Sequence, residues 1–508
     1  MATFHDLPEE LVAQITESLS PSTLLCWARV NRRSLELSRL KLRDLSQKYA
    51  TLDLDGGAST YRKVMDILKE PILGELVREI CGESWFIPDP DLPSWPMVFK
   101  EKSDNEEFAT LWEERATELG LLGITQELEM DAILDNRTLF MLKRTIALCF
   151  PLFPWIRRIS TRGENGFEMG SISHLVQQQV KRLFLPDTLV APNTFSLLED
   201  VRIDCCATQH SVRFEDVLRF LKLPNLKIFH ANDVIGYGDG NPEPHDAQND
   251  KDILAIRSIP SRCRLQELQL LLSNVSDLDI EIIFEVINAA ALQSFKLQQA
   301  SVDTEDDGAM YHPREIVRTL AKCCHNTLEK LDLQTDSEML GWHLDMNADN
   351  DDYYEPDSEG AYSLYKASLD IEHNLQKFSS LKSITINAEM LLNGFGAVTR
   401  ADAAAQDGNG QDERQYDWIE TDPYEALPIS HLLPPSLEVL RLSAVQDCQI
   451  EVLNEKFEEL FGGLSSGQSP ESFPALKEVI VGEYVEDWSP GKTVWSLEEG
   501  FEPLHSVE

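Results

Sequence analysis

The chain has 508 residues and is strongly acidic, with 87 Asp and Glu side chains against 45 Lys and Arg and a formal net charge of −42 at pH 7. This charge disfavours nonspecific binding to nucleic acid and to anionic membranes, so we expect neither among its partners. The hydrophobic content of 42% is typical of a globular chain. The length suits several domains, or one module followed by an extended array.

Cysteine usage and the absence of long apolar runs indicate the compartment. The nine cysteines form no C-x-x-C pair and have no regular spacing, which argues against a disulfide framework and a zinc site. No apolar run reaches the ~18 residues of a membrane span, and the N-terminus does not read as a secretory signal. We therefore expect a protein of the cytoplasm, the nucleus or both, with no membrane partner.

Residues 3–38 predict three short helices. We expect the first to begin near Leu7, with Asp6 as its N-cap and Pro8 in the first turn, and Ser20-Pro21 to end it. Ser22 or Thr23 is the predicted cap of the second helix. The third follows Val30-Asn31-Arg32-Arg33. A basic stretch runs from Arg29 to Lys48 and is interpreted as a solvated face or as a contact with an acidic partner.

The three predicted helices carry more large apolar side chains than such short elements can cover. Those of the first recur at four-residue spacing, at Leu7, Leu11, Ile15 and Leu19. A module of about fifty residues is marginal for burying a core. Its apolar surplus is either an interaction site or a surface packed on the rest of the chain, and the residues alone leave both readings open.

The order of these residues resembles an F-box, the motif by which substrate receptors of cullin–RING ubiquitin ligases hold the Skp-type adaptor. The resemblance covers about the first 40 residues, and Leu35 stands where many F-boxes have tryptophan. It implies a Skp-type adaptor, and through it a cullin, as partners. It also implies that eight residues form or support the adaptor-binding surface: Leu7, Pro8, Leu11, Ile15, Leu19, Leu24, Leu25 and Val30.

Residues 49–175 predict a mostly helical connecting region after an F-box at 1–48. From about 176 to 485 the pattern L-x-x-L-x-L returns at irregular intervals, and each instance predicts a turn followed by a short strand with alternate residues facing inward. The instances begin at Val180, Leu198, Leu226, Leu265, Leu292, Leu328, Leu381, Leu437 and Leu476. Stretches with helical periodicity lie between some of them, at 214–220, 279–287 and 314–321.

Stacked in parallel, such strands form a continuous sheet closed by the intervening helices, as in a leucine-rich-repeat solenoid. The array resembles the divergent leucine-rich repeats that often follow an F-box. The predicted fold class is therefore α/β, a three-helix F-box followed by an irregular solenoid with a parallel sheet. Acidic insertions are expected at about 231–252, 336–362 and 393–428, and a C-terminal tail at 486–508.

No stretch of the sequence predicts catalysis or a cofactor. Asp345-x-Asn347-x-Asp349 begins like a calcium loop, but Asn350 and Pro356 stand where that loop needs glycine and glutamate. The glycines of residues 235–240 lack the lysine of a phosphate loop, and neither G-x-S-x-G nor H-E-x-x-H occurs. Trp418 and Tyr424 are read either as anchors for a partner or as side chains packed on the array.

These observations predict a non-enzymatic substrate-recognition subunit of a Skp–cullin–F-box-type ubiquitin ligase, whose repeats bind an unidentified protein substrate. The alternative is a stand-alone leucine-rich-repeat scaffold in which residues 1–40 are a helical cap. A third reading is an enzyme that binds metal through its acidic loops. The acidic insertions favour a basic partner on electrostatic grounds.

Overall fold

The fold is described from a computed structural model of the chain. The structure describes residues 7–30, 32–53, 58–82, 110–111, 114–115, 153–163, 195–205, 212–236, 253–259, 263–299, 312–335, 371, 374–392, 398–400, 416–418, 429–445, 447–461, 464, 468–483, 492–496 and 500–501. Contacts divide the chain into two compact units. The first comprises Met1–Val212 and Arg219–Ile228, and the second comprises Arg213–Leu218 and Phe229–Glu508.

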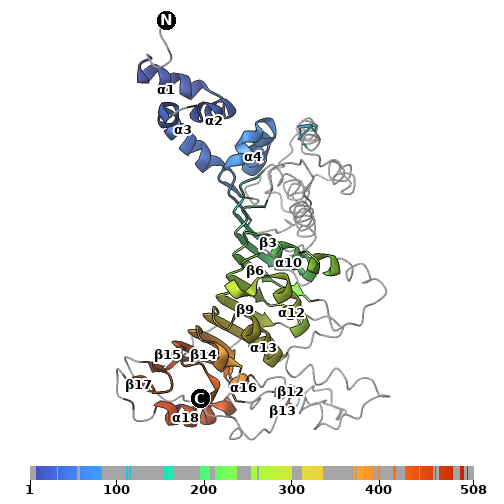
Figure 1. The fold of residues 1–508 in the computed structure, drawn as a ribbon, viewed down its shortest axis with the longest axis vertical. Helices are drawn as coiled ribbons and strands as arrows, with labels where there is room; N and C mark the ends of the chain where they lie inside the picture. Colours follow the sequence, from blue (N-terminus) through green and yellow to red (C-terminus); the bar gives the residue numbers. More distant parts are fainter. Residues whose placement is uncertain are drawn as a thin grey trace, which may run out of the picture. The chain divides into compact units, whose positions relative to one another are not determined.

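The first unit begins with three helices (Figure 1), namely α1 (Glu9–Ser18), α2 (Pro21–Ala28) and α3 (Arg32–Tyr49). The prediction of three helices is confirmed, with two corrections to their ends. Helix α1 begins at Glu9 rather than near Leu7, because Pro8 is extended and occupies the N-cap position. Ser20, rather than Ser22 or Thr23, caps α2, since its Oγ accepts from the Thr23 backbone N–H at 3.3 Å.

A parallel sheet follows in the same unit, in the order β1-β2-β3-β4. Its strands are β1 (Thr51–Asp53), β2 (Glu79–Gly82), β3 (Arg158–Gly163) and β4 (Asp200–Cys205), and α4 (Ala58–Lys69) and the 3-10 helix η3 (Pro71–Leu76) lie between β1 and β2. The prediction that 49–175 is mostly helical is wrong at β1, β2 and β3. Their buried residues follow the array's pattern with smaller or shorter side chains, as in Ile156-x-x-Ile159-x-Thr161.

The second unit contains strands in the order β6-β8-β9-β10-β11-β14-β15-β16-β17, parallel in register from β8 to β15. They are β6 (Ile228–Asn232), β8 (Glu267–Leu271), β9 (Ser294–Gln299), β10 (Lys330–Thr335), β11 (Ser383–Asn387), β14 (Val439–Val445), β15 (Glu478–Glu483), β16 (Lys492–Ser496) and β17 (Gly500–Phe501). Eight of the nine predicted strands are thereby confirmed across the two units. The ninth, at 180–185, lies outside the described residues.

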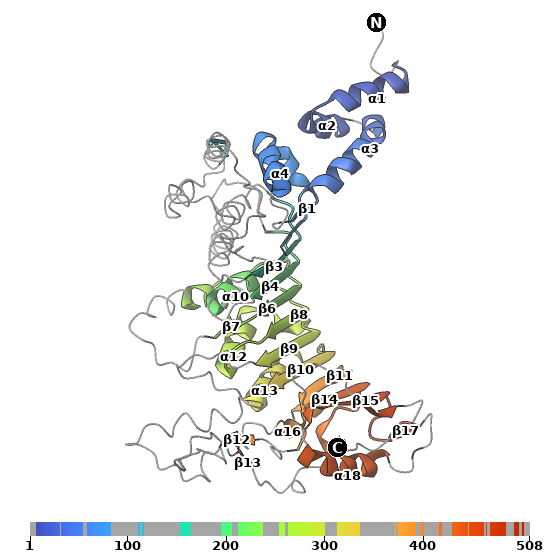
Figure 2. The same cartoon turned by 180° about the vertical axis from the view of Figure 1, so that it is seen from behind.

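Helices cover one face of the strands of the second unit, and α12 and α13 lie on the same side of β8, β9 and β10 (Figures 1 and 2). The helices are α10 (Phe214–Leu221), whose residues are divided between the two units, α12 (Asp277–Val286), α13 (Pro313–Cys324), α16 (Ala388–Leu391), α17 (Ile429–Leu432) and α18 (Asp447–Phe461), with η5 (Ala289–Ala291) and η6 (Leu375–Lys377). The predicted helices at 214–220, 279–287 and 314–321 are confirmed. Short strands also occur: β5 (Val212–Arg213), β7 (Val234–Ile235), β12 (Val398–Arg400) and β13 (Tyr416–Trp418).

The core lies between the sheet and its helices. In successive strands the first, fourth and sixth residues of each L-x-x-L-x-L segment are almost fully buried, as Leu328, Leu331 and Leu333 show. This alternation is what a strand with one covered face requires. The other face of the sheet carries the intervening polar residues, and in the second unit we call it the open face.

The final strands correct the prediction of a tail at 486–508. Strand β16 pairs antiparallel with β15, and β17 pairs antiparallel with β16. Trp495 is almost fully buried and stacks on Phe461 of α18, with ring centroids 4.7 Å apart. The parallel array therefore ends in a small antiparallel cap with its own aromatic contacts.

Among the described residues, no helix is both long and apolar enough to cross a membrane.

Candidate protein-interaction surfaces

An apolar surface remains exposed on the three N-terminal helices. Small side chains dominate the contacts between them, because Thr16, Ala28, Ser34 and Ser38 are buried there together with Val12 and Leu24. The larger apolar side chains lie outward instead. The exposed fractions are 47% for Leu11, 40% for Ile15, 65% for Val30, 49% for Leu35 and 73% for Leu40.

The eight residues predicted to bind an adaptor divide into three groups. Leu11, Ile15, Val30 and Pro8 are exposed, whereas Leu7, Leu19 and Leu25 are half-buried. Leu24 is fully buried, so it supports the helices from inside. Leu35 and Leu40 are two further exposed side chains that the eight did not include. Their place in a run of leucines on α3 was the available signal, but periodicity alone does not show which leucines face outward.

Basic residues of α3 hold the helices together. Lys41 Nζ donates to the backbone carbonyls of Thr16, Glu17 and Leu19 at 3.1, 2.6 and 3.0 Å. A cation at the carbonyl end of a helix is favoured by the helix dipole. Arg33 donates to the carbonyl of Leu7 at 3.1 Å. These two cations of the predicted basic stretch are therefore used inside the module.

The helices are also tied to the rest of their unit. The backbone N–H of Ser22 donates to Glu70 at 3.0 Å, and Arg29 pairs with Glu75 at 2.7 Å. At the end of α3, the Tyr49 hydroxyl donates to Asp66 at 2.5 Å. These contacts involve α2 and α3 and leave Leu11 and Ile15 of α1 exposed.

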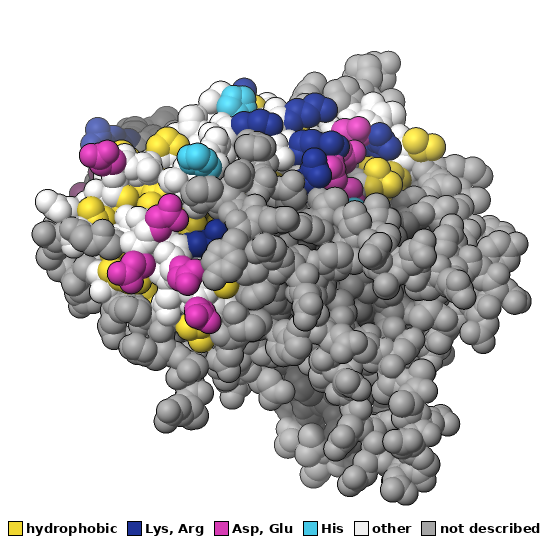
Figure 3. Space-filling view, turned by 90° about the horizontal axis from the view of Figure 1, so that it is seen from below, with side chains coloured by type: hydrophobic (Ala, Val, Ile, Leu, Met, Phe, Trp, Pro, Cys, Tyr) yellow, Lys and Arg dark blue, Asp and Glu magenta, His cyan; other side chains and the backbone are white. Residues whose placement is uncertain are grey.

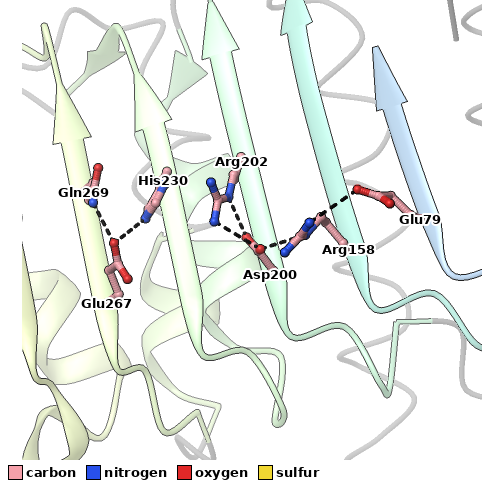
Figure 4. Close-up of polar contacts among 7 residues, drawn as sticks. All are labelled: Glu79, Arg158, Asp200, Arg202, His230, Glu267 and Gln269. Atoms are coloured by element: carbon pink, nitrogen blue, oxygen red, sulfur yellow. Dashed lines mark hydrogen bonds and ion pairs between the residues drawn. The ribbon is translucent and has the colours of Figure 1, made fainter. Parts of the chain in front are cut away.

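The polar face of the first unit's sheet carries an ion-pair row. Arg158 Nε lies 2.8 Å from Asp200, which also accepts from Arg202 Nε at 3.1 Å (Figure 4). Arg158 Nη1 lies 3.6 Å from the carboxylate oxygen Oε1 of Glu79. Asp200 is largely buried beneath the two arginines. The row joins β2, β3 and β4 through side chains that the parallel register places opposite one another.

The open face of the second unit carries two similar groups. Glu267 accepts from Gln269 at 2.6 Å and lies 2.9 Å from His230 (Figure 4). On the next strands, Lys296 Nζ lies 3.0 Å from Asp332, which also accepts from Gln334 at 2.8 Å. Burial raises the pKa of Asp332, while Lys296 opposes that shift. Hydrogen-bonding side chains thus line this face.

A third charged feature follows the N-terminal edge of the strands. From the segment that begins at Leu198 to the one that begins at Leu476, the residue after the first leucine is Glu, Lys, Gln, Gln, Glu, Lys, Glu and Lys in turn. Glu199 pairs with Lys227 at 3.2 Å in the first unit, and Glu329 pairs with Lys382 at 2.8 Å in the second. Glu438 pairs with Lys477 in the same way. Each pair joins neighbouring segments and so favours their correct register.

The described residues do not form a metal centre, since they include no group of three or more His, Cys, Asp or Glu side chains suited to hold an ion. The calcium-like loop at 345–356 and Tyr424 lie outside the described residues, as do the side chain of Trp418 and His343. Of the glycine-rich loop, Gly236 is described. Its N–H donates to Asn274 O at 2.6 Å, and a Cβ there would lie 2.2 Å from Asp279.

The thiols of Cys323 and Cys324 are poor nucleophiles. Burial raises the pKa of Cys323, and it raises the pKa of Cys324 to about 12. A thiol reacts as its thiolate, so a raised pKa slows the reaction of both side chains near neutral pH. Cys324 is buried and Cys323 is partly exposed.

Comparison with known proteins adds no relative to this description. No family model matches the chain, and no curated protein aligns with it at a significant level.

Proposed function

We propose that this chain is the substrate-recognition subunit of a Skp–cullin–F-box-type ubiquitin ligase. The N-terminal helices form an F-box that binds a Skp-type adaptor. The strand array is an irregular leucine-rich-repeat solenoid that binds a protein substrate. The subunit itself catalyses no bond change, and it promotes ubiquitin transfer by holding the substrate near the conjugating enzyme.

One observation carries this proposal. Leu11, Ile15 and Val30 occupy F-box positions predicted from the sequence, and they remain exposed although the helices around them are packed. Single apolar side chains scattered over a protein surface are normal, but several exposed apolar side chains on one module of about fifty residues are typical of an interaction site. The polar interior of the module, with Thr16 and two serines, makes room for those larger side chains outside.

Adaptor recovery tests the proposal. A tagged full-length chain carrying Leu7→Ala and Pro8→Ala is expected to remain folded but to lose the adaptor that the wild-type chain co-purifies. Truncating these partly exposed residues removes contact area without opening the module's core. Undiminished adaptor recovery by the double variant, with Skp-type adaptor present in equal amount, would refute the assignment.

The alternative is a stand-alone scaffold in which residues 1–40 are a helical cap, and the contacts of Ser22 and Arg29 with the following segment favour it. Deleting residues 1–45 separates the two functions. Removing a cap exposes apolar core and causes aggregation, whereas removing a docking module leaves a soluble array without adaptor. Light scattering together with adaptor recovery distinguishes these outcomes.

A further inference from the structure

Three cationic side chains lie on the open face of β9, β10 and β14, within four neighbouring strands that also include β11. Lys330 projects from the first position of β10, and Lys296 and Arg441 lie one row further along. In that row Lys296 is opposite Asp332, which is opposite Thr385, which is opposite Arg441. We call Lys296, Lys330 and Arg441 the cationic patch.

Among the described residues on the open face of these four strands, Asp332 is the carboxylate that accompanies the three cations. Asp332 accepts from Lys296 and is mostly buried. Arg441 lies close enough to favour the charged form of Asp332, and its Nη1 lies 3.4 Å from the Ser383 hydroxyl. Lys330 and Arg441 are exposed, and among the described residues neither forms an ion pair. The four strands therefore present a net positive surface within a chain of net charge −42.

Neighbouring carboxylates are already engaged. Glu267 on β8 contacts Gln269 and His230, and Glu329 and Glu438 at the edge pair with lysines of the next segments. Glu478 on β15 also has a contact of its own. The cations at the edge belong to the same pairs. Among the described residues of this open face, Lys330 and Arg441 are the exposed cations outside an ion pair, and they lie within the patch.

The geometry points to an acidic occupant. We propose that the cationic patch binds an extended, Asp/Glu-rich segment of a protein partner, which on the proposed function is the substrate. Four strands spaced about 4.8 Å apart span roughly 14 Å, which four or five extended residues cover. Hydroxyls and amides of this face, including Ser383, Thr385 and Gln334, are further donors for carboxylates.

The net negative charge of the chain repels an acidic partner, whereas the cationic patch attracts it. Screening by salt decides which effect is stronger. At physiological ionic strength the Debye length is about 8 Å, so acidic side chains elsewhere are largely screened while the patch acts at contact. One acidic area lies on α18, which exposes Glu451, Glu455, Glu458 and Glu459. Seen from below, the described surface shows acidic side chains toward the left and a group of Lys and Arg side chains at the upper right (Figure 3). Binding should therefore depend on a few cations and weaken sharply with salt.

Peptide binding to the full-length chain tests the proposal without adaptor. The probe is a fluorescein-labelled octa-glutamate peptide, measured by fluorescence anisotropy at low and physiological salt. The patch variant is Lys330→Glu with Arg441→Glu, and the control is Arg264→Glu with Lys322→Glu, which changes the net charge equally in the turn before β8 and on α13. All four side chains are exposed, so neither variant is expected to unfold the chain.

We expect the patch variant to bind the peptide at least about tenfold more weakly and the control within about twofold of wild type. The conservative variant Lys330→Arg with Arg441→Lys should retain binding. Equal loss in patch variant and control, no binding by wild type, or tighter binding of octa-lysine would overturn the proposal. Binding of a serine-phosphorylated peptide but not of octa-glutamate would overturn the choice of carboxylates. Adaptor recovery should be the same in all variants, so failure of the F-box assignment is detected separately.

Discussion

Neighbouring residues of α1 allow interface and core to be separated on one helix. Leu11 and Ile15 are 47% and 40% exposed, whereas Val12 between them is fully buried. Fully burying a large apolar side chain contributes about 1.5–3 kcal/mol. An adaptor that covers the exposed half of both Leu11 and Ile15 should therefore gain about 1.5–3 kcal/mol in binding free energy from the two side chains together. At about 1.4 kcal/mol per tenfold, Leu11→Ala with Ile15→Ala should weaken adaptor binding roughly 10- to 140-fold.

Val12→Ala is the matched control for that double variant. It removes two buried methyl groups and leaves a cavity, which should lower the free energy of unfolding by about 1–3 kcal/mol. Titration calorimetry with purified adaptor and thermal unfolding of each variant measure both effects. The reasoning is refuted if Leu11→Ala with Ile15→Ala destabilises the chain more than Val12→Ala does while the adaptor affinity of the folded protein stays unchanged.

Three further predictions follow from charges and thiols. Lys227→Glu places two carboxylates together at the strand edge and should lower stability by about 0.2–1 kcal/mol, and adding Glu199→Lys should restore it, as urea unfolding would reveal. In the native chain, maleimide should label the exposed thiol of Cys26 and leave Cys324 unlabelled until denaturant is added, as judged by peptide mass mapping. Burial raises the pKa of Asp332 above 3.8, so the folded chain holds this proton more tightly than the unfolded chain does. The free energy of unfolding should therefore fall as pH rises from 3.8 to the raised pKa. Asp332→Asn should lack this slope when unfolding is measured from about pH 3 to 7.

The strands that the sequence predicted share one physical signal. Large branched side chains alternate with polar ones and follow a turn, and a strand with one buried face needs that alternation. The earlier strands were missed because β1 has three residues and β2 ends in Gly82, while Thr161 stands at a buried position of β3. The terminal strand β16 was missed because the consecutive residues Val494 and Trp495 are both buried, so it does not alternate, and β17 has two residues.

The candidate surface was predicted in outline and not in detail. The four-residue spacing of Leu7, Leu11, Ile15 and Leu19 indicated an apolar face on the first helix. The buried side of that helix instead contains Val12 and Thr16. Periodicity identifies a face but not what covers it, because close packing through small residues produces no hydrophobic signal. The cationic patch was missed for a related reason, since its residues come from segments up to 145 positions apart, from Lys296 to Arg441.

The central claim concerns the exposed apolar surface of the N-terminal helices, and direct binding to purified adaptor tests it. Native mass spectrometry of the full-length chain mixed with a purified Skp-type adaptor is expected to show a one-to-one complex. That complex should be lost in the chain carrying Leu11→Ala and Ile15→Ala. A wild-type chain with native helical content that forms no complex with the adaptor would contradict the account.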